Sequence, residues 1–503
     1  MTPSFNIKRV HQILKTKKLA LFIVTYNAER HIQKTIERIP KEIINQLIEI
    51  YLIDDFSSDK TIKKAESTFK SLGIDNYRIM RTPFNQGYGG NQKIGYKYAI
   101  KNNYDYVIML HGDGQYPPEF IPCIIEQFYN AEISAVFGSR MINKYQALRG
   151  GMPLYKWFGN QVLTNIENRL MNSRLSEFHS GYRAYSVATL KLLPFHLNSN
   201  NFHFDTDIII QLLANNFKIT EIPIPTHYGD EICHVNGVKY FWNCLKSVIK
   251  YRFYKIGIFY QPNFDMKLSL IRNYQLKNNP NSLHYYIVNK LPWSKTDLVV
   301  DLGANDGALS AKISPMVSGI VAVDTQKPDI KHGIESLELD LNTDFQDILG
   351  HNKYDKVIAL DIIEHLYDPE ESMARINGII KTDGKLYIST ANIAFIIMRI
   401  TLMLGWFNYG KKGILDKTHH RLFTINTFKR LLKNSGFKIE EVVGFGPPIA
   451  DGISSIGIFG IIDKIAGFFA RLKPSIFAFN FLIIAKKKMS LNEVYDLTIK
   501  SFE

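Results

Sequence analysis

The chain has 503 residues, too many for a single hydrophobic core, so we expect two or three domains. Its composition, 46% hydrophobic and 21% charged, is ordinary for a soluble globular protein. A formal charge of +14 and a pI near 9.3 predict an anionic partner: nucleic acid, anionic lipid or a phosphorylated substrate. No basic run accompanies a recognisable nucleic-acid fold. We therefore favour an anionic lipid or a phosphorylated substrate and expect no nucleic-acid partner.

The cysteines and the amino-terminal segment bear on location. Cys123, Cys233 and Cys244 show no metal or redox spacing, which fits a reducing compartment. Residues 1–18 are basic, but neither a signal-type apolar stretch nor a small-residue cleavage site follows them. We therefore expect a cytoplasmic protein with peripheral contact at the inner face of the membrane.

The first half alternates strands and helices. Apolar runs at Leu19–Thr25, Ile48–Ile53 and Val107–Leu110 have the length and composition of buried strands. Helical spacing follows the first of them, over residues 30–40. This order predicts a parallel sheet with right-handed crossovers, in which ligands bind beyond the carboxyl ends of the strands.

The third of these strands ends in a motif suited to a cation. His111, Asp113 and Gln115 occupy alternate positions, so their side chains can point the same way. Oxygen ligands and one carboxylate suit a hard divalent cation that also holds a diphosphate. The alternative is a polar turn that simply ends the strand.

Two other loops carry polar residues. Asp54 and Asp55 end the second strand, where they can accept hydrogen bonds from a base or ribose, while Asp59 can cap the following helix. Residues 85–91 form a glycine-rich loop that opens a helix over residues 92–102. That loop either brings backbone amides to a phosphate or is only a turn.

Five motifs occur in the order seen in family 2 glycosyltransferases. The resemblance covers roughly residues 19–230, and the dolichyl-phosphate mannosyltransferase branch is the most similar. The motifs are Val24–Glu29, Ile53–Thr61, Asn85–Gly87, His111–Gln115 and Phe137–Arg140.

The resemblance implies a GT-A fold that binds a nucleotide-diphosphate sugar and transfers the sugar with inversion. It implies that Asp113 and Gln115 bind Mg²⁺ or Mn²⁺ on the diphosphate. His111 replaces the first acidic residue of the family's motif; a neutral imidazole tolerates Mn²⁺ better than Mg²⁺, and His111 is either a ligand or a supporting residue. The implied donor-binding residues are Tyr26, Asn27, Glu29, Asp54, Asp55, Asn85 and Arg140.

Residues 176–185 resemble the family's acceptor-side motif. Arg183 either grips an acceptor phosphate or pairs with a local carboxylate. For a sugar-hydroxyl acceptor, Asp205 or Asp207 is the candidate general base, whereas a lipid phosphate needs none. The alternative is a structural role, in which Asp205 caps a helix and Asp207 lies in its first turn. The catalytic and structural roles are compatible with each other.

The end of the first half is aromatic and basic. Residues 222–225 read as an edge segment, because proline cannot donate to a ladder, and residues 228–236 as a lid over the diphosphate. Residues 237–260 either lie in a membrane interface or pack between two domains, but charges recur too often for a spanning helix. Residues 261–281 read as a linker.

The strand–helix rhythm then restarts. Leu298–Val300 leads into a glycine turn, Asp301–Gly307, and the next strand ends in Asp324. A carboxylate about 20 residues after such glycines is typical of ribose binding. Further strands are expected at residues 337–340, 357–366 and 385–390.

Residues 282–487 resemble the class I S-adenosylmethionine-dependent methyltransferases. The resemblance implies that Asp301, Gly303 and Gly307 face the methionine moiety of S-adenosyl-L-methionine, Asp324 the ribose and Asp340 the adenine. A dehydrogenase-like nucleotide-binding domain is the rival. It lacks support because the third glycine is missing and the Glu364–His365 motif stays unexplained.

Four features remain in the second half. His365 is either a base or orienting group near the methyl acceptor or a buried structural histidine. Residues 419–421 either meet an anionic acceptor or form a solvated loop. Residues 391–407 read as a cap over the acceptor pocket that can touch lipid, and residues 476–485 suit the last pair of strands.

We therefore predict a bifunctional α/β enzyme: a GT-A glycosyltransferase followed by a Rossmann-like methyltransferase. The sugar acceptor would be a polyprenyl phosphate or a glycan, and the methyl acceptor a glycan or related precursor. The alternative is a binding or scaffold protein with degenerate sites. The predicted segments are a tail (1–18), the glycosyltransferase (19–236), a helix and linker (237–281), the methyltransferase (282–487) and a second tail (488–503).

Overall fold

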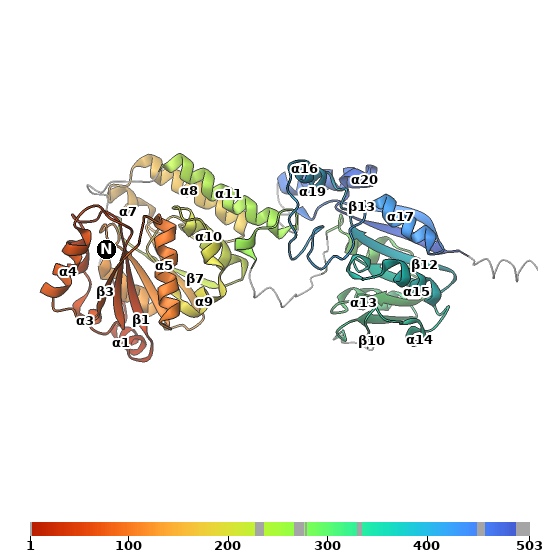
Figure 1. Ribbon diagram of the computed structural model, residues 1–503, viewed down its shortest axis with the longest axis horizontal. Coiled ribbons are helices and arrows are strands. Elements are labelled where there is room, and N and C mark those ends of the chain that lie inside the picture. Colours follow the sequence, from red (N-terminus) through yellow and green to blue (C-terminus); the bar gives the residue numbers. More distant parts are fainter. Residues whose placement is uncertain are drawn as a thin grey trace, which may run out of the picture. The chain divides into compact units, whose positions relative to one another are not determined.

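The computed structural model shows two α/β units (Figure 1). It describes residues 3–226, 236–265, 276, 279–328, 334–449 and 458–488. The first unit comprises residues 1–251 and 261–270, and the second comprises residues 252–260 and 271–503. The predicted fold class, two successive α/β domains, is confirmed. Residues 228–235 of the predicted lid and most of the predicted linker lie outside the described residues.

The sheet of the first unit has the strand order β3-β2-β1-β4-β6-β5-β7. The strands for which a parallel arrangement was predicted, β1, β2 and β4, pair in parallel, whereas β6 is antiparallel to β4 and β5. The cause is a long excursion through two helices after β5, which returns the chain to the sheet from the opposite end. The strands are β1 (Leu19–Thr25), β2 (Glu49–Asp54), β3 (Tyr77–Arg81), β4 (Tyr106–His111), β5 (Ile133–Ser139), β6 (Arg183–Ser186) and β7 (Lys218–Pro223).

Helices cover both faces of this sheet, because its central strands are apolar on both sides. Leu21 and Ile23 of β1 enter one core, and Phe22 enters the other. Strand β7 lies at an edge, as its proline predicted. The helices are α1 (Ile7–Thr16), α2 (Ile32–Glu37), α3 (Lys41–Ile44), α4 (Thr61–Ser71), α5 (Tyr88–Lys101), α6 (Ile121–Gln127), α7 (Lys144–Arg149), α8 (Leu154–Met171), α9 (Val187–Leu192), α10 (Phe204–Ala214) and α11 (Gly237–Lys255).

Two helices begin where the sequence did not suggest. Residues 1–18 were predicted as a tail, yet α1 buries Val10, Ile13 and Leu14 in the core of the sheet. Helix α5 begins at Tyr88 rather than Gln92, because Gly87 adopts a φ of +77° that turns the chain directly into the helix.

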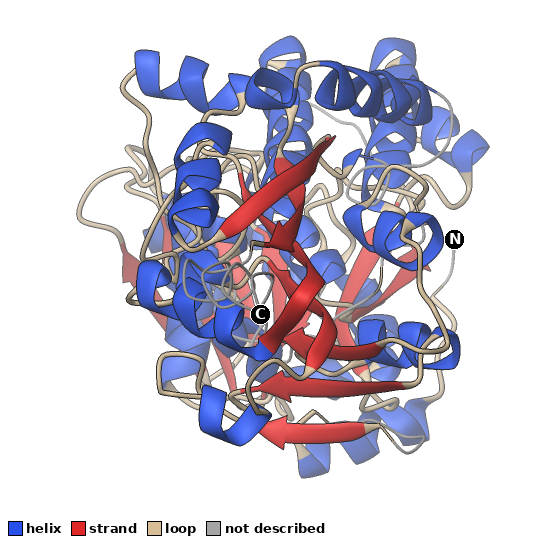
Figure 2. Cartoon of the chain, turned by 90° about the vertical axis from the view of Figure 1, so that its right-hand side faces the viewer, coloured by secondary structure: helices blue, strands red, loops and turns tan. Residues whose placement is uncertain are grey.

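The sheet of the second unit has the order β10-β9-β8-β11-β12-β14-β13. Figure 2 draws the strands of the chain in red. Strand β14 is antiparallel to both β12 and β13. Residues 476–485 therefore supply one of the last two strands, not both. The strands are β8 (Leu298–Leu302), β9 (Gly319–Asp324), β10 (Glu335–Glu338), β11 (Tyr354–Leu360), β12 (Ile380–Ala391), β13 (Phe437–Phe445) and β14 (Asn480–Lys487).

Helix α17 of this unit has a well-defined start. Thr424 and Thr427 form a reciprocal capping box that starts α17, whose buried face includes Phe428 and Leu432. Among the described residues, none of the helices combines the length and hydropathy needed to cross a membrane. The helices are α12 (Leu283–Lys290), α13 (Ala308–Ile313), α14 (Gln346–Leu349), α15 (Pro369–Ile379), α16 (Ile396–Met403), α17 (Ile425–Asn434), α19 (Ile458–Leu472) and α20 (Pro474–Phe477).

Candidate functional site

A pocket of about 1040 Å³ opens in the first unit at the carboxyl ends of β1, β2 and β4. The parallel register explains why these strand ends meet: Val24 pairs with His111, and Thr25 pairs with Asp54. The predicted site residues that line the pocket are Tyr26, Asp55, Asn85, His111, Asp113, Gln115, Arg140 and Asp205.

His111 and Asp113 face each other at the end of β4. His111 Nδ1 lies 4.0 Å from Asp113 Oδ2, and the backbone amide of Gln115 donates to Asp113 Oδ1 at 3.0 Å. Burial lowers the pKa of His111, which favours the neutral imidazole. The Asp113 side chain is 38% exposed, so one carboxylate and one neutral ring nitrogen are presented to the pocket.

Gly181 allows the other side of the His111 ring to be closely covered. A Cβ on Gly181 would lie 2.6 Å from His111 Nε2 and 2.7 Å from the Tyr88 hydroxyl, closer than atoms can approach. The amide of Gly181 also donates to the Tyr116 hydroxyl at 2.7 Å. Any residue larger than glycine at position 181 would push His111 out of position.

Asp205 is held in the pocket wall by two side chains of α5. The Tyr88 hydroxyl donates to Asp205 Oδ2 at 2.9 Å, and Gln92 Nε2 donates to Oδ1 at 3.2 Å. Helix α10 begins at Phe204 with His203 as its N-cap residue, so the prediction that Asp205 caps this helix was wrong. Its carboxylate is held by α5 and lies 3.7 Å from the Arg183 guanidinium, and Asp205 lines the pocket.

Asp207 lies outside the pocket lining. Its Oδ2 accepts the backbone amide of Ser199 at 3.0 Å, and the side chain is almost fully buried. Burial raises the pKa of Asp207, and hydrogen bonds from Ser199 and Ser247 oppose that rise. Asp207 therefore lies in the first turn of α10, as predicted, and contacts the loop before it.

Asp55 and Asn85 form one side of the pocket together. Asp55 Oδ1 accepts from the Gln86 amide at 2.8 Å and from the Thr82 hydroxyl at 3.1 Å. Asn85 Nδ2 donates to the Asp55 carbonyl at 3.2 Å. Burial raises the pKa of Asp55 although these donors favour its charged form.

The amides of the glycine-rich loop already have a partner. Gly89 donates to the carbonyl of Asn200 at 2.8 Å, and Gly90 donates to the same oxygen at 3.3 Å. These two amides therefore match the prediction of a simple turn rather than that of a phosphate-binding loop.

Three predicted donor-binding residues are absent from the pocket lining and brace its loops instead. Asn27 Oδ1 accepts the Ser58 amide at 2.9 Å, and Glu29 Oε2 accepts the Lys60 amide at 3.0 Å. Asp54 is fully buried and accepts the Ser57 amide at 2.9 Å. The first two contacts tie the loop after β1 to the loop after β2.

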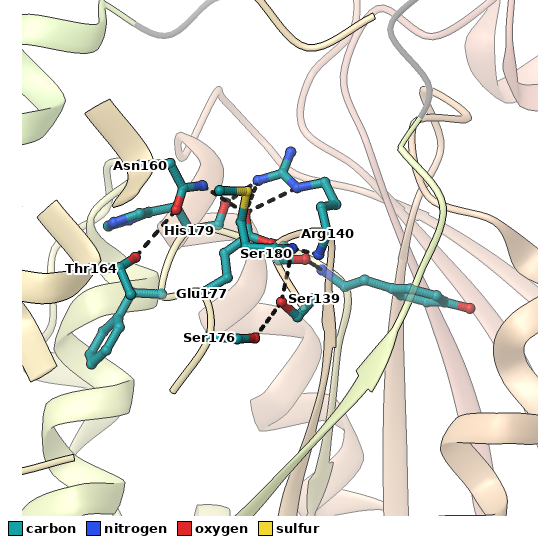
Figure 3. Close-up of polar contacts among 12 residues, drawn as sticks. Ser139, Arg140, Asn160, Thr164, Ser176, Glu177, His179 and Ser180 are labelled. Carbon is teal, nitrogen blue, oxygen red and sulfur yellow. Dashed lines mark hydrogen bonds and ion pairs between the residues drawn. The ribbon is translucent and has the colours of Figure 1, made fainter. Parts of the chain in front are cut away.

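Arg140 is fixed in the wall by a buried carboxylate (Figure 3). Its Nε donates to Glu177 Oε1 at 3.0 Å, and a second nitrogen donates to the His179 carbonyl at 3.1 Å. Asn160 also donates to Glu177 Oε1, at 2.8 Å. Burial alone would raise the pKa of Glu177, but Arg140 and these hydrogen bonds outweigh it and leave the pKa below its usual value.

Arg183 lies behind the pocket rather than in it. Its guanidinium donates to the carbonyls of Ser180 at 2.7 Å, Phe178 at 2.8 Å and Asp205 at 3.0 Å. The side chain is 1% exposed. Arg183 Nη1 also lies 3.7 Å from Asp205 Oδ1, which is the local carboxylate partner of the alternative prediction. These contacts hold the turn that carries Gly181.

Part of the pocket lining could not be predicted from the sequence. Tyr88 was visible in the glycine-rich loop and His179 in the acceptor-side motif, but neither was assigned a role. Residues from α8 and α11 had no signal, because only the fold brings these distant helices to the strand ends. The missed residues include Tyr88, Asn91, Tyr116, Lys156, Asn160, His179 and Tyr240.

In the second unit, the glycine turn after β8 is sharply left-handed. Gly303 and Gly307 have φ values of +78° and +75°, and Asn305 between them has +53°. The amides of Gly303 and Ala304 donate to the Val323 carbonyl at 2.8 and 2.9 Å. The turn is thereby fixed against the end of β9.

The predicted acids of this unit follow neighbouring strands. Asp324 Oδ2 accepts the Asn305 amide at 2.8 Å, and Asp340 follows β10, which pairs with β9. Asp301 is buried and accepts from the Ser310 hydroxyl at 2.6 Å. Burial raises the pKa of Asp301 to about 6. Asp324 and Asp340 thus share one edge of the sheet with the glycine turn, with Asp301 behind it.

Glu364 and His365 follow β11 at the same edge. Burial and the nearby Asp361 raise the pKa of Glu364 to about 8. His365 Nδ1 lies 3.0 Å from the Thr418 hydroxyl, and its ring contacts the His419 ring at 4.7 Å. The fold therefore brings together two histidines that the sequence analysis treated as separate features.

Comparison with protein-family models assigns both units. The model described as glycosyl transferase family 2 matches residues 20–192, and a model described as methyltransferase domain matches residues 284–442. The chain joins a family 2 glycosyltransferase domain to a methyltransferase domain.

Named relatives match the glycosyltransferase domain. The chain is 28% identical to UDP-N-acetylglucosamine–dolichyl-phosphate N-acetylglucosaminyltransferase of Methanococcus voltae, over 42% of this chain and 87% of that protein. It is 23% identical to undecaprenyl-phosphate mannosyltransferase of Micrococcus luteus, over 41% of this chain and 82% of that protein. Glucosyl-3-phosphoglycerate synthase of Mycobacterium tuberculosis, solved with Mn²⁺ and uridine diphosphate, matches with 15% identity and a TM-score of 0.38, over 50% of this chain and 82% of that one.

The glycosyltransferase pocket has donors that fit a divalent cation. Asp113 supplies a partly exposed carboxylate, and His111 supplies a neutral ring nitrogen on the same side. An ion bound by so few protein atoms would keep sites for phosphate oxygens and water, as Mg²⁺ and Mn²⁺ do with nucleotides. Gln115 also lines the pocket and offers an amide oxygen.

The methyltransferase domain has a turn that fits S-adenosylmethionine. A Cβ on Gly303 would come within 3.0 Å of the Ile362 side chain, so the closely curved backbone requires glycine. Asp324 lies beside this turn and is only partly buried. Such a carboxylate, next to a glycine turn, suits the hydroxyls of a ribose.

Proposed function

We propose that the glycosyltransferase domain moves a sugar from a nucleotide-diphosphate donor to a polyprenyl phosphate, with inversion and with help from Mn²⁺ or Mg²⁺. The observation that carries this proposal is the convergence of Asp113, His111 and Asp55 in one pocket of about 1040 Å³. The lipid-phosphate acceptors in the names of two relatives support the acceptor class, with a glycan hydroxyl as the second candidate.

The roles of the residues follow from their positions. Tyr26, Asp55 and Asn85 line the side suited to the nucleotide, where Asp55 can accept from a base or ribose. The bound cation would neutralise charge on the leaving diphosphate. Asp113, with His111 and Gln115 beside it, would hold that cation, and Arg140 would add a positive charge near the phosphates, partly offset by Glu177.

The acceptor decides whether a base is needed. A polyprenyl phosphate is already ionised, so its oxygen can attack the anomeric carbon as the bond to the diphosphate breaks. A glycan hydroxyl would need to lose a proton, and Asp205 is then the group in the pocket wall that can accept it. Asp207 faces another loop and is the weaker candidate.

The test is donor turnover by the purified full chain with nucleotide sugars and Mn²⁺. We expect Asp113→Ala to reduce turnover by a factor on the order of 10²–10³, as when an electrostatic contact to the reacting group is removed. Asp75→Ala removes an exposed carboxylate outside the pocket lining and is the matched control. Equal turnover in Asp113→Ala and Asp75→Ala would contradict the proposed metal site.

We further propose that the second domain uses S-adenosyl-L-methionine to methylate the same glycan or a linked precursor. The cofactor supplies an electrophilic methyl group; Gly303 and Gly307 would leave room for its methionine end beside Asp301, Asp324 would hold the ribose and Asp340 the adenine. His365, oriented by Thr418, would act on the acceptor. The joining of both domains in one chain supports a shared pathway of cell-envelope glycan assembly.

Calorimetric binding of S-adenosylmethionine tests the second domain. Loss of a charged hydrogen-bond acceptor typically costs about 1.5–3 kcal/mol, so Asp324→Ala should weaken binding by roughly 10- to 100-fold. Asp347→Ala removes a carboxylate that is 88% exposed and serves as the control. Unchanged affinity in Asp324→Ala would argue against this pocket.

Peripheral contact with a membrane surface belongs to the same proposal. In α11 the Trp242 and Val238 side chains are 62% and 72% exposed, and Lys239 and Lys246 lie on the same helix. An aromatic and basic helix of this kind suits an interface with anionic lipid. A lipid-linked acceptor would then reach the pocket from the bilayer.

A further inference from the structure

Helix α19 of the methyltransferase unit is amphipathic in the reverse of the usual sense. Its inward side consists of Asp463, Gly467 and Ala470, and Asp463 accepts hydrogen bonds from Asn279 at 3.0 Å and Asn281 at 3.1 Å. A surface helix of a globular protein normally buries its apolar stripe. Here the apolar residues face outward: Ile461 (59% exposed), Ile462 (40%), Ile465 (50%), Phe468 (63%), Phe469 (42%) and Leu472 (67%).

A second exposed apolar segment lies beside it. Helix α16 and the residues after it expose Leu402, Met403 and Trp406, of which Met403 is 87% exposed. Arg399 of α16 donates to the Ser475 carbonyl of α20 at 3.2 Å, and Phe469 of α19 contacts Phe477 of α20 at 5.4 Å. Figure 1 shows α16, α19 and α20 at one end of this unit.

The exposed charges of the two segments that form this surface have one sign. Residues 396–415 contain no Asp or Glu, and in residues 458–477 the only acid is the buried Asp463. Lys464, Arg471 and Lys473 are exposed along α19 and just after it. Long basic side chains can extend to lipid head groups while their stems lie along apolar surface.

We propose that the α16–α19 surface, comprising the outward residues of α19 and residues 400–407, docks into an anionic bilayer. A second copy of the chain is disfavoured because a two-fold pairing would bring the basic rims together. The choice of a bilayer as the partner rests in part on the proposed lipid-linked acceptor. The apolar surface and its basic rim are observed independently of that proposed function.

Vesicle co-sedimentation of the full chain tests this surface. The vesicles contain phosphatidylcholine with or without phosphatidylglycerol, and neither polyprenyl phosphate nor sugar donor. We expect binding that is stronger with phosphatidylglycerol, and a loss of roughly tenfold or more in the double variant Ile465→Asp/Phe468→Asp. Ile348→Asp, at a 58% exposed position of α14 at the other end of the unit, should bind like the wild type.

The controls separate this inference from the proposed function. Asp113→Ala should bind vesicles normally even though sugar transfer is lost. Matched thermal unfolding shows that the double variant is folded. The proposal is overturned if the wild type does not bind, if the double variant binds as well as the wild type, or if it only converts a wild-type dimer into a monomer.

A different cluster in the glycosyltransferase unit points to a second ligand. One ligand atom each from Glu167 of α8, His179 and Cys244 of α11 lie within 4.8 Å of one another. Glu167 Oε2 and His179 Nε2 are 3.2 Å apart, yet neither atom makes a hydrogen bond to any described residue. Glu167 and Cys244 are fully buried, and the His179 side chain is 7% exposed.

Two neighbouring hydroxyl groups contact the side chains of this cluster. His179 Nδ1 lies 2.9 Å from the Tyr240 hydroxyl, and the Thr206 hydroxyl lies 3.2 Å from Cys244 Sγ. In the tautomer whose Nδ1–H donates to Tyr240, Nε2 carries a lone pair that can bind a cation. A partner on the far ring nitrogen is the usual arrangement around a metal-bound histidine.

We propose that Glu167, His179 and Cys244 bind a zinc-like divalent cation, separate from any ion at Asp113. Mixed nitrogen, oxygen and sulfur donors suit Zn²⁺, whereas Mg²⁺ requires oxygen ligands. Such an ion would join α8, α11 and the His179 loop along the wall of the donor pocket.

Cobalt substitution tests this site without any assay of activity. The full chain is treated with a chelator and then titrated with Co²⁺, whose bond to a thiolate gives a near-ultraviolet absorption band. We expect the band in the wild type and in Cys123→Ser, and its loss in Cys244→Ser. No band in the wild type, or an equal band in a Cys244→Ser protein with normal thermal unfolding, would overturn the proposal.

Discussion

Each of the two domains buries a glutamate near its proposed site, but the pKa of that glutamate is shifted in opposite directions in the two domains. In the glycosyltransferase domain, Glu177 receives hydrogen bonds from Arg140 and Asn160, and its pKa lies below the usual value. In the methyltransferase domain, burial and then the nearby Asp361 raise the pKa of Glu364 to about 8. A buried carboxylate with a fixed cation stays charged, whereas one beside another acid keeps its proton.

This difference reflects how the two sites are built. The glycosyltransferase pocket combines residues from strand ends, α5, α8 and α11, so it needs paired charges to hold distant segments together. The methyltransferase site is a local turn between neighbouring strands, fixed mainly by backbone contacts such as Gly303 to Val323. Substitutions should therefore damage the first site through lost pairing and the second through altered backbone or protonation.

The largest effect should come from breaking the buried pair in the first domain. Glu177→Ala leaves Arg140 without its carboxylate, and removing one partner of a buried ion pair typically destabilises a protein by about 3–5 kcal/mol. Glu132→Ala breaks an ion pair with Lys218 in which both side chains are more than half exposed, and should cost less than about 1 kcal/mol. Denaturant unfolding compares the two, and equal losses would contradict the assigned difference.

A smaller effect should appear as a pH dependence in the second domain. The pKa of Glu364 is higher in the folded state than the usual 4.5, so the folded chain binds more protons, and stability falls as pH rises from about 4.5 to about 8. The amplitude should be on the order of a few kcal/mol, because one pKa unit corresponds to about 1.4 kcal/mol.

Scanning calorimetry of the full chain at several pH values measures this dependence. Glu364→Gln removes the titrating proton and should reduce the slope of melting temperature against pH, most clearly between about 6 and 8, above the pKa of Asp301. The pKa of Glu177 is lowered, so its stabilisation is present above pH 4.5 and is lost as pH falls below it. A Glu364→Gln protein with the wild-type slope would show that another group is responsible.

The smallest effect should come from the glycine turn. Gly303→Ala forces a Cβ into a φ of +78°, which costs about 1–2 kcal/mol, and the Cβ meets Ile362. Gly159→Ala, in the interior of α8 with open space around its Cβ, should instead stabilise by about 0.5–1 kcal/mol. Opposite signs in urea unfolding are expected, and stabilisation by Gly303→Ala would contradict the strained turn.

The sequence predicted those site residues whose role follows from a strand end. Asp55, His111 and Asp113 line the pocket because parallel strands bring their carboxyl ends to one edge. The same reasoning found Asp324 beside the glycine turn. These positions depend only on strand register, which an apolar run followed by polar residues reveals.

Other roles depended on contacts that the sequence does not contain. For Arg183 the sequence left two roles open, and the structure places its guanidinium 3.7 Å from Asp205 Oδ1 and among three carbonyls. Tyr240 joins the pocket because α11 returns to it, and no local pattern announces that return. The outward apolar face of α19 was also invisible, since apolar periodicity alone cannot say which face of a helix is buried.

The central claim is that Asp113 holds a divalent cation against the donor diphosphate. The most direct measurement is the anomalous signal from crystals of the full chain soaked with Mn²⁺ and a nucleoside diphosphate. We expect a manganese peak within bonding distance of Asp113, lost in crystals of Asp113→Ala. A nucleotide bound in the pocket with manganese elsewhere, or with none at all, would contradict it.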